Sequence, residues 1–453
     1  MKKENLALLC DFYEFTMSQG YFKQGLRDRI CYFDVFFRKV PDGGAFAIFA
    51  GLEDILDFVS HLSFSEDDIE FLRKQELFDE DFLAFLSEFK FEGEIYAMCE
   101  GELVFANEPL MIIKARAIEA QLLETFLLCT INHQSLIATK ANRIVRAAGN
   151  KPVLEFGARR AHGSQAALKG SKAAILGGCL STSNTLACKL YGLRPSGTMA
   201  HSWVQMFESE YEAFKAYVRL YPKNPILLID TYECFMGLEN AIKVFKEEGV
   251  KEGGVRLDSG DLATLSVALR QRLDKAGLSH FKIVVSNGLD EYGIEALKDA
   301  PIDAFGVGER LITATPNAIF GGVYKLVASE EKGIIVPKIK ISEDRQKSTT
   351  PHLKRVFRIY DEKGKALYDE LFIYDEILPP PPLNCQRVEL LRCVFKEGKP
   401  CVRVPSLEQS ADFCRQQSLK FDEDLLKLKP KKNYKLVLSK RLKDLKKKLK
   451  TRF

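Results

Sequence analysis

Residues 254–261 read Gly-Val-Arg-Leu-Asp-Ser-Gly-Asp, a short apolar run that ends in charged and turn-forming residues. The first four residues suit a buried strand, and Asp258 or Ser259 can cap a helix predicted over residues 261–275. A strand that leads directly into a helix is half of a strand–helix–strand unit, in which the strands are parallel. The segment therefore favours an α/β fold, provided that the same pattern recurs along the chain.

The pattern recurs from about residue 152 onward. The runs predicted as strands are Val153–Phe156, Gly197–His201, Ile226–Asp230, Gly254–Leu257, Ile283–Ser286, Asp303–Val307 and Val323–Val327. The helices predicted between them cover residues 208–220, 236–248, 261–275 and 290–298. Alternation at this spacing predicts parallel strands with crossover helices, and six or seven such units favour a barrel over an open sheet.

Residues that can carry chemistry stand at the end of each predicted strand. They are Glu155 and Arg159, His201, Asp230, Arg256 and Asp258, Ser286 and Asn287, and Gly306 and Gly308. Active sites of α/β barrels lie at the C-terminal ends of the strands. The sequence therefore predicts one cluster that holds a histidine, arginines, aspartates and a glycine-rich turn.

Three of these positions suit anion or metal binding and also have a structural interpretation. Arg256 suits phosphate or carboxylate, because a guanidinium donates two parallel hydrogen bonds. Asp258 suits Mg²⁺ or a ribose hydroxyl, and it can cap the following helix as well. The turn from Gly306 to Gly308 lets the backbone approach a phosphate, although it can be only a tight strand-to-helix turn. We favour phosphate there because phosphate sites are frequent at late barrel strands.

His201 is the most reactive candidate in the cluster. Imidazole can act as a base, a metal ligand or a phosphoryl acceptor, although a lone histidine is more often structural. Asp230, one strand further, can orient His201 by accepting its other ring N–H. Arg159 and Arg160 can form surface ion pairs, but the preceding Gly157 indicates a sharp turn out of the sheet, which favours a place in the cluster.

Composition limits the class of protein. The 453 residues are 46% hydrophobic and 28% charged, which is ordinary for a globular chain of two or three domains. The chain has no run of 18 apolar residues, so no membrane-spanning helix is predicted. Asp11 and Glu14 interrupt any signal-peptide core. We therefore expect a cytoplasmic protein without a membrane partner. Residues 427–453 hold thirteen Lys or Arg against Asp444, so the rest is net negative, and we expect no nucleic-acid partner.

The cysteines and the C-terminal leucines have structural interpretations. There are 11 cysteines and no Cys-x-x-Cys pair, so reduced thiols are expected. The late group is Cys385, Cys393, Cys401 and Cys414. It lacks the tight ligand pairs of structural zinc motifs, so zinc is not expected there. Leu438, Leu442, Leu445 and Leu449 have helical spacing, which predicts an amphipathic helix docked on its own protein.

These motifs together make the chain resemble the nicotinate phosphoribosyltransferase family. The segments that carry the resemblance are Asp11–Glu14, Glu155–Arg160, Gly197–Ser202, Arg256–Asp261 and Phe305–Gly308. The resemblance implies an irregular α/β barrel of the type II phosphoribosyltransferase kind over residues 116–340. It also implies an N-terminal α+β open sandwich over residues 1–115 and a C-terminal region, 341–453, that returns to it. The family further implies a homodimer with active sites shared between subunits.

The implied reaction converts nicotinate, 5-phosphoribosyl-1-diphosphate, ATP and water into nicotinate mononucleotide, diphosphate, ADP and phosphate. It serves NAD biosynthesis by salvage of nicotinate and uses Mg²⁺. By resemblance, His201 is the transient phosphohistidine, Asp230 orients it, and Asp258 contacts ribose or metal, with Asp290 as the other candidate metal ligand. Tyr13 would stack on the pyridine ring across the dimer, opposite Phe156. The remaining implied substrate-binding residues are Arg38, Arg159 and Arg256 for anionic groups, Gly306 and Gly308 for the 5-phosphate, and Thr198, Ser286 and Asn287 nearby.

Three alternatives remain beside this interpretation. The nicotinamide enzyme of the same fold places an Asp where residues 181–184 here read Ser-Thr-Ser-Asn, and a carboxylate there would repel nicotinate. The quinolinate enzyme is much shorter and lacks the ATP-linked histidine. A non-catalytic phosphoribosyl- or nucleotide-binding protein is disfavoured because His201, Asp230 and Asp258 are all intact. Attachment of the basic tail to RNA or an anionic membrane is the less favoured use of that segment.

Overall fold

The computed structural model describes residues 5–342 and 348–452. The chain forms two compact units, one from Met1–Leu136 with Ile319–Phe453 and the other from Ile137–Ala318. The boundaries predicted at residues 115 and 340 therefore differ from those of the structure. The second boundary moves because residues 322–337 form strands of the first unit's sheet and not the end of a barrel.

The second unit is built on six parallel strands. They are β6 (Val153–Glu155), β7 (Ser181–Thr182), β8 (Ile226–Leu228), β9 (Gly254–Leu257), β10 (Lys282–Val285) and β11 (Ala304–Val307). Their order across the sheet is β7-β6-β11-β10-β9-β8, with every pair parallel. This order confirms the predicted α/β class. Within the described residues, β7 and β8 end the sheet and share no ladder with each other.

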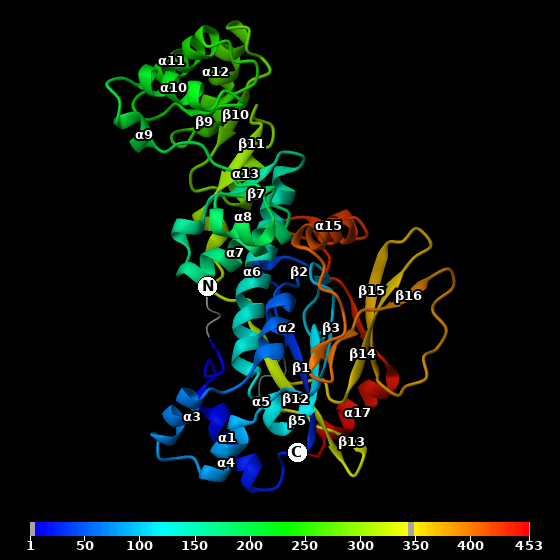
Figure 1. Cartoon of the computed structure of the whole chain (residues 1–453). Helices are drawn as coiled ribbons and strands as arrows, with labels where there is room; N and C mark the ends of the chain where they lie inside the picture. Colours follow the sequence, from blue (N-terminus) through cyan, green and yellow to red (C-terminus); the bar gives the residue numbers. More distant parts are fainter. Residues whose placement is uncertain (1–4, 343–347, 453) are drawn as a thin grey trace. The chain divides into compact units, whose positions relative to one another are not determined.

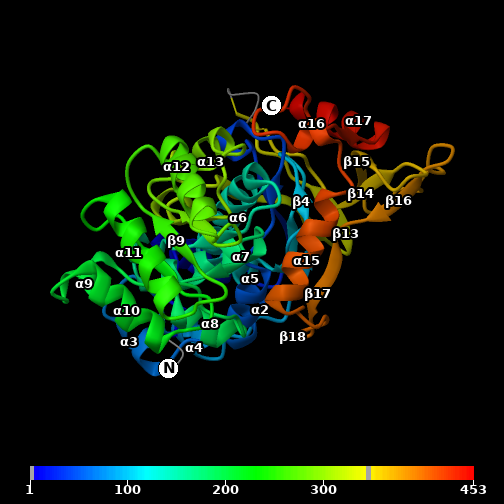
Figure 2. The ribbon, with the colours of Figure 1, turned by 90° about the horizontal axis from the view of Figure 1, so that it is seen from above.

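Helices follow most of these strands, as the periodicity predicts. They are α7 (Ser164–Leu176), α8 (Thr185–Tyr191), α9 (His201–Gln205), α10 (Glu210–Leu220), α11 (Cys234–Glu247), α12 (Leu262–Lys275), α13 (Glu291–Ala296) and α14 (Glu309–Ile312). Polar caps fix where several of them begin: Ser209 caps α10, and the Asp261 carboxylate accepts from the Thr264 N–H to cap α12. Figures 1 and 2 show α10, α11 and α12 packed together beside β9.

One predicted strand is wrong, and another belongs to a different sheet. Gly197–His201 is not a strand: an isolated bridge between Thr182 and Pro195 precedes it, and α9 begins at His201. Pro195 has no N–H to donate to a ladder, which limits pairing here. Val323–Val327 does form a strand, but it lies within β12 (Gly322–Glu331), which runs antiparallel to β1 (Ile30–Phe37) in the first unit.

The first unit contains a seven-stranded antiparallel sheet in the order β13-β12-β1-β5-β3-β17-β18. The further strands are β3 (Glu94–Ala97), β5 (Met111–Arg116), β13 (Ile334–Pro337), β17 (Arg392–Lys396) and β18 (Lys399–Pro400). The aromatic run over residues 32–37 lies in β1, which is almost wholly buried. Because β17 pairs with β3, the C-terminal region does return to the N-terminal sheet.

Two smaller sheets complete this unit. The first has the order β16-β14-β15-β19, and the second pairs β2 with β4. Their strands are β2 (Ala47–Ile48), β4 (Leu103–Val104), β14 (Lys354–Tyr360), β15 (Ala366–Ile373), β16 (Gln386–Glu389) and β19 (Leu436–Leu438). Arg358 on β14 is fully buried and forms an ion pair with Asp369 on β15 at 2.9 Å. Such a buried charge is tolerated because it is paired.

Helices complete the first unit. They are α1 (Phe12–Lys23), α2 (Leu52–His61), α3 (Glu66–Arg73), α4 (Glu80–Ser87), α5 (Ala117–Gln121), α6 (Glu124–Ala148, which runs on into the second unit), α15 (Leu407–Ser418), α16 (Glu423–Leu426) and α17 (Lys440–Lys450). Ser65 forms a capping box at the start of α3. Helix α17 buries Leu442 and Leu449 against its own protein, while Leu438 lies in β19. Across the described ranges, no helix is long and apolar enough to span a membrane.

Candidate active site

The ends of the parallel strands gather most of the predicted site residues in the second unit. Asp258 is the centre of this group: its N–H donates to Asp230, its carboxylate accepts from Ser286 and faces His201, and Arg256, two residues before it, donates to Thr198. Tyr13 and Arg38 belong to the first unit. The structure therefore forms the core of the predicted cluster from one unit of the chain.

His201 is the first residue of α9, and its side chain is 42% exposed. Its Nδ1 lies 3.1 Å from the Thr231 hydroxyl oxygen, and its Nε2 lies 4.0 Å from Asp258 Oδ2. The ring is therefore held at one nitrogen by a hydroxyl and faces a carboxylate with the other. An exposed imidazole beside a carboxylate can accept a chemical group from a substrate and release it again.

Asp230 does not orient His201 as predicted. Its Oδ2 accepts hydrogen bonds from the Asp258 backbone N–H at 2.8 Å and the Ser259 hydroxyl at 2.6 Å. The Asp230 carboxylate therefore binds the loop after β9 and not His201. The Thr231 hydroxyl lies beside His201 Nδ1. The contact of Thr231 with His201 was not predicted from the sequence, in which the one hint is that Thr231 directly follows Asp230.

Asp258 is held by its neighbour on the next strand. The Ser286 hydroxyl donates to Asp258 Oδ1, which leaves Oδ2 facing His201. Among the described residues, Asp230 Oδ1 is buried without a hydrogen-bond partner. These two carboxylate oxygens fit a hard cation such as Mg²⁺, which takes one or two protein carboxylates and completes its shell with phosphates and water. In the same described ranges, no cluster of three or more His, Cys, Asp or Glu could hold a metal ion alone.

Asp290, the other candidate metal ligand, has a structural role in α13. Its Oδ1 accepts from the backbone N–H groups of Tyr292 at 3.1 Å and Gly293 at 2.8 Å, so it caps the helix. Asn287, just before it, has a φ of 110°, a region that favours glycine. Such strained positions are frequent at functional sites, and the binding role of Asn287 stays a prediction.

Arg256 is a positive charge without a matching carboxylate. Its two terminal nitrogens donate to Thr198 Oγ1 at 3.0 Å and to the Met199 carbonyl at 2.9 Å, both neutral acceptors. Its Nε is buried with no partner among the described residues. Burial lowers the pKa of Arg256, although Asp258 and Asp230 act in the opposite direction. A guanidinium held in this way is ready to bind an anion.

Arg256 borders a cavity of about 530 Å³ in the second unit. The other lining residues are Leu154, Phe156, Pro195, Ser196, Gly197, Thr198, Tyr217, Tyr221, Lys223, Asn224, Pro225, Ile226 and Val284. Its walls combine aromatic and aliphatic side chains with polar groups, among them two cations, the half-buried Arg256 and the exposed Lys223. That combination suits a small aromatic anion. Arg159, predicted to bind an anion, is exposed and close enough to lower the pKa of Arg256.

The loop that carries Phe156 and Arg159 is fixed by Glu155. The Glu155 carboxylate is fully buried and accepts hydrogen bonds from the Gly157 N–H and from the Ser171 and Thr182 hydroxyls. Donors from β7 and α7 therefore satisfy this buried charge. The sequence predicts that Glu155 ends its strand. It contains no pattern that predicts how Glu155 fixes the following loop.

Gly306 makes room for the Phe156 ring. A Cβ at Gly306 would lie 2.6 Å from two Phe156 ring carbons and 3.3 Å from Ser286 Cβ. A Cβ at Gly308 would come no closer than 3.3 Å, to the Phe156 carbonyl oxygen. The four-residue helix α14 begins immediately after Gly308. The glycine pair thus shapes the aromatic wall of the cavity, and its binding of a phosphate stays a prediction.

Replacing Gly306 by alanine should displace the Phe156 ring and destabilise the fold by about 1–3 kcal/mol, because the added methyl overpacks a closed contact. The unfolding midpoint in urea measures this effect. Gly308→Ala is the matched control, and it should shift the midpoint less. Equal shifts for the two variants would contradict the packing role of Gly306.

The two predicted residues in the first unit are placed by β1 and α1. Asp11 begins α1 with a capping box, in which its N–H donates to Glu14, and this puts Tyr13 in the first turn with 43% of its surface exposed. Arg38 directly follows β1 and lies 5.5 Å from the Phe36 ring centre. Neither contact shows a role in binding a ligand.

Comparisons with known proteins agree on one family. Three family models match: the nicotinate phosphoribosyltransferase (NAPRTase) N-terminal domain over residues 8–132, the nicotinate phosphoribosyltransferase (NAPRTase) family over 152–373 and the nicotinate phosphoribosyltransferase C-terminal domain over 382–446. The chain is 43% identical over 381 residues to nicotinate phosphoribosyltransferase of Bacillus subtilis, which spans 82% of this chain and 78% of the relative. It is 42% identical over 415 residues to nicotinate phosphoribosyltransferase pncB2 of Mycobacterium tuberculosis, spanning 91% and 86%.

Solved structures show the same similarity. The crystal structure of human nicotinic acid phosphoribosyltransferase matches with a TM-score of 0.83 and 29% identity, over 97% of this chain and 99% of that one. Nicotinate-nucleotide pyrophosphorylase from Pyrococcus furiosus matches with a TM-score of 0.75 and 23% identity, over 93% and 97%. The second match supports the fold alone. The predicted fold class is therefore confirmed by strand order and by likeness to a solved structure.

Proposed function

The chain belongs to the nicotinate phosphoribosyltransferase family, and from this premise we propose that it joins nicotinate to 5-phosphoribosyl-1-diphosphate, with ATP hydrolysis coupled to the transfer. The products are nicotinate mononucleotide and diphosphate, which supply NAD biosynthesis. The observation that carries the proposal is the Arg256 guanidinium, whose buried Nε has no partner among the described residues, at a cavity that Phe156, Tyr217 and Tyr221 help to line. An assay that detects nicotinate mononucleotide by chromatography tests the proposal. Absence of that product would contradict the proposal.

Recognition of nicotinate rests on Arg256 and Phe156 in this proposal. The pyridine ring lies against the Phe156 face, and an anionic group of the substrate meets the Arg256 guanidinium. The residues after β7 support an acidic substrate, because Ser183 and Asn184 offer no carboxylate that would repel it or accept an amide N–H. The nicotinamide alternative lacks that supporting carboxylate.

Departure of diphosphate from ribose C1 builds positive charge on the sugar and negative charge on the leaving group. Arg256 and Arg159 would meet the negative charge, and the backbone from Gly306, in β11, to Gly308, just after it, would meet the 5-phosphate. Asp230, through the Oδ1 that has no partner among the described residues, and Asp258 would hold Mg²⁺. When bound, Mg²⁺ neutralises the departing diphosphate. The pyridine nitrogen is already nucleophilic, so no base on the protein is needed for attack.

His201 is the residue that ATP phosphorylates in this proposal. Thr231 holds Nδ1, and Asp258 faces Nε2 at 4.0 Å, so the ring is oriented and stays accessible. A carboxylate near the second nitrogen stabilises the charged ring that forms as a phosphoryl group arrives or leaves. Phosphorylation would place negative charge beside Asp258 and so change the site's affinity for its anionic substrates and products.

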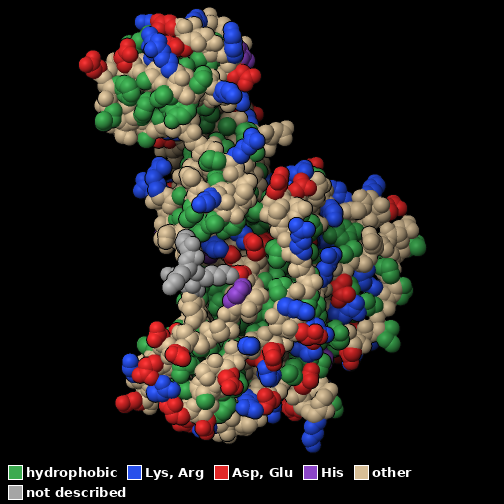
Figure 3. Space-filling model, in the orientation of Figure 1, with side chains coloured by type: hydrophobic (Ala, Val, Ile, Leu, Met, Phe, Trp, Pro, Cys, Tyr) green, Lys and Arg blue, Asp and Glu red, His purple; other side chains and the backbone are tan. Residues whose placement is uncertain are grey.

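A homodimer completes the site in this proposal, because Tyr13 comes from the partner subunit. Tyr13 belongs to a run of exposed apolar side chains on α1, with Phe12 at 47% and Met17 at 39% exposure. The second unit has its own exposed apolar set, visible over α9 to α11 in Figure 3, which comprises Met206, Leu220, Tyr221, Tyr232 and Met236. Surfaces of this kind mark protein–protein contacts.

Tyr13→Ala should raise the KM for nicotinate about 2- to 13-fold, because aromatic stacking contributes about 0.5–1.5 kcal/mol. Tyr13→Phe keeps the ring and is the matched control, which should leave KM unchanged. Initial rates over a range of nicotinate concentrations measure both variants. An unchanged KM in Tyr13→Ala would contradict stacking.

Mixing Tyr13→Ala subunits with Arg256→Ala subunits tests whether the two residues meet across a dimer. If they do, half of the sites in each mixed dimer regain both native residues, and a component with the native KM appears. If Tyr13 served its own subunit, every site in the mixture would keep one substitution. A mixture without any native-KM component would therefore overturn the shared site.

A further inference from the structure

Cys393 and Cys401 lie beside each other on the hairpin formed by β17 and β18. The strands pair Phe395 with Pro400 and Lys396 with Lys399. The Cys401 N–H donates to the Val394 carbonyl at 2.8 Å, so Cys401 lies opposite Val394. Cys393 is the next residue along β17, which makes the two cysteines diagonal neighbours across the hairpin.

A β-bulge brings their side chains to the same face. In a regular strand, Cys393 and Val394 would point to opposite faces, and Cys401 would follow Val394. However, Cys393 pairs with Tyr96 of β3 and Phe395 pairs with Ile95, so Val394 is an extra residue. The bulge removes one step of the alternation, and Cys393 can therefore face the same side as Cys401.

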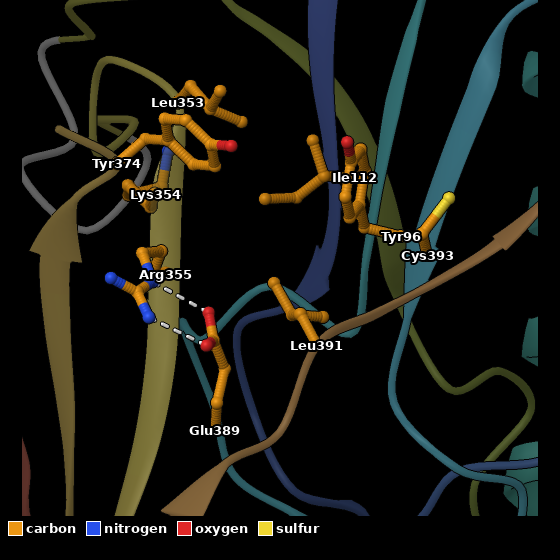
Figure 4. A pocket seen from close by; sticks show the side chains of 9 residues that line it. All are labelled: Tyr96, Ile112, Leu353, Lys354, Arg355, Tyr374, Glu389, Leu391 and Cys393. Carbon is orange, nitrogen blue, oxygen red and sulfur yellow. Dashed lines mark hydrogen bonds and ion pairs between the residues drawn. The ribbon is translucent and has the colours of Figure 1, made fainter.

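The distance and the environment both suit a bond between the two sulfurs. Strand spacing and rise per residue place diagonal neighbours about 6 Å apart at Cα, within the range of a disulfide. Burial, and next the Cys401 thiol itself, raise the pKa of Cys393 to about 11, as expected for adjoining thiols. Cys401 is exposed, while Cys393 is half-buried at one end of a cavity of about 420 Å³ beside Tyr96 (Figure 4).

We propose that Cys393 and Cys401 form a redox-sensitive dithiol that a small disulfide such as oxidised glutathione converts into an intramolecular disulfide. The exposed Cys401 thiolate attacks one sulfur of oxidised glutathione and releases the first glutathione thiolate. Cys393 then loses its proton to solvent, attacks Cys401 Sγ and releases the second glutathione. Two protein thiols are oxidised, and one glutathione disulfide is reduced to two glutathiones.

The bond would connect β17 and β18 at one edge of the seven-stranded sheet. Strand β18 has two residues and ends the sheet, and Pro400 lacks an N–H for pairing. Among the described residues, no third metal-ligating side chain joins the two thiols in a cluster that could bind zinc. A disulfide is therefore the chemistry that this pair of thiols fits.

The test oxidises the full-length protein with glutathione disulfide and maps its cysteines by mass spectrometry without reduction. The expected product lacks two hydrogen atoms and contains a Cys393–Cys401 cross-link, its melting temperature is about 2–5 °C higher, and dithiothreitol reverses both changes. In Cys393→Ser, the glutathione should stay on Cys401, because the attacking thiol is missing. Cys129→Ser removes a lone exposed thiol of α6 and should change nothing.

Three outcomes would overturn the proposal. They are stable glutathione adducts on both cysteines of the native protein, a cross-link from Cys401 to another cysteine, and no reaction of Cys401 at all. A cross-link that leaves the melting temperature unchanged would overturn its role at the sheet edge. None of these readouts depends on catalytic turnover.

Discussion

Arg256→Ala should lower kcat/KM for nicotinate by about 30- to 5,000-fold, because truncating a buried charged partner costs about 2–5 kcal/mol. The loss is expected because Arg256 has a buried Nε with no partner of its own and lies at the cavity that would receive the substrate. The two hydrogen bonds to Thr198 and Met199 are also lost, so the circular dichroism spectrum must be checked for a native fold. Steady-state rates over nicotinate concentration measure the effect.

Two matched variants separate charge from shape. Arg256→Lys keeps the charge but loses the planar fork, and it should retain an intermediate kcat/KM. Arg160→Ala removes a neighbouring, exposed arginine whose contact is Glu309 at 3.7 Å, and it should leave kcat/KM nearly unchanged. A native kcat/KM in Arg256→Ala, with the fold intact, would show that another cation binds the substrate.

His201→Ala should abolish phosphorylation of the protein by ATP and remove the stimulation of turnover by ATP. His201 is oriented by Thr231 and Asp258 at the exposed edge of the site, and alanine has no atom that can accept a phosphoryl group. Turnover without ATP should persist, because Arg256 and Asp258 remain. Incorporation of labelled phosphate from γ-labelled ATP and the ratio of rates with and without ATP measure the two effects.

His162→Ala is the control for this substitution, because His162 is an exposed histidine in the same unit. It should incorporate phosphate and respond to ATP as the native protein does. Full ATP coupling in His201→Ala would remove His201 from the proposed mechanism. Loss of all activity with a native fold would instead assign His201 a role in the transfer itself.

The strands of the second unit could be predicted where the sequence carries both a buried run and a cap. Strand β9 appears over the predicted residues 254–257, because its apolar run is followed by Asp261, which caps α12. Gly197–His201 has a similar apolar content but forms no ladder, since Pro195 limits pairing and α9 starts at His201. A short apolar run predicts that a segment is buried, but it does not identify the strand with which the segment pairs.

The same limit explains the misplaced domain boundary. Val323–Val327 is apolar and β-branched like a barrel strand, yet it pairs with β1, almost three hundred residues earlier in the chain. The partner of a strand is a long-range property that local sequence does not encode. Within the site, the positions of Arg256 and Asp258 could be predicted because they end a strand, but the partner of Asp230 depends on a loop conformation that leaves no sequence signal.

Turnover of purified protein with 5-phosphoribosyl-1-diphosphate and Mg²⁺ tests the proposed function most directly. Nicotinate, nicotinamide and quinolinate should be offered separately, each with and without ATP. We expect a mononucleotide from nicotinate alone, formed faster when ATP is present. Product from nicotinamide or quinolinate in place of nicotinate, or no product from any of the three, would contradict the assignment of substrate and reaction to this site.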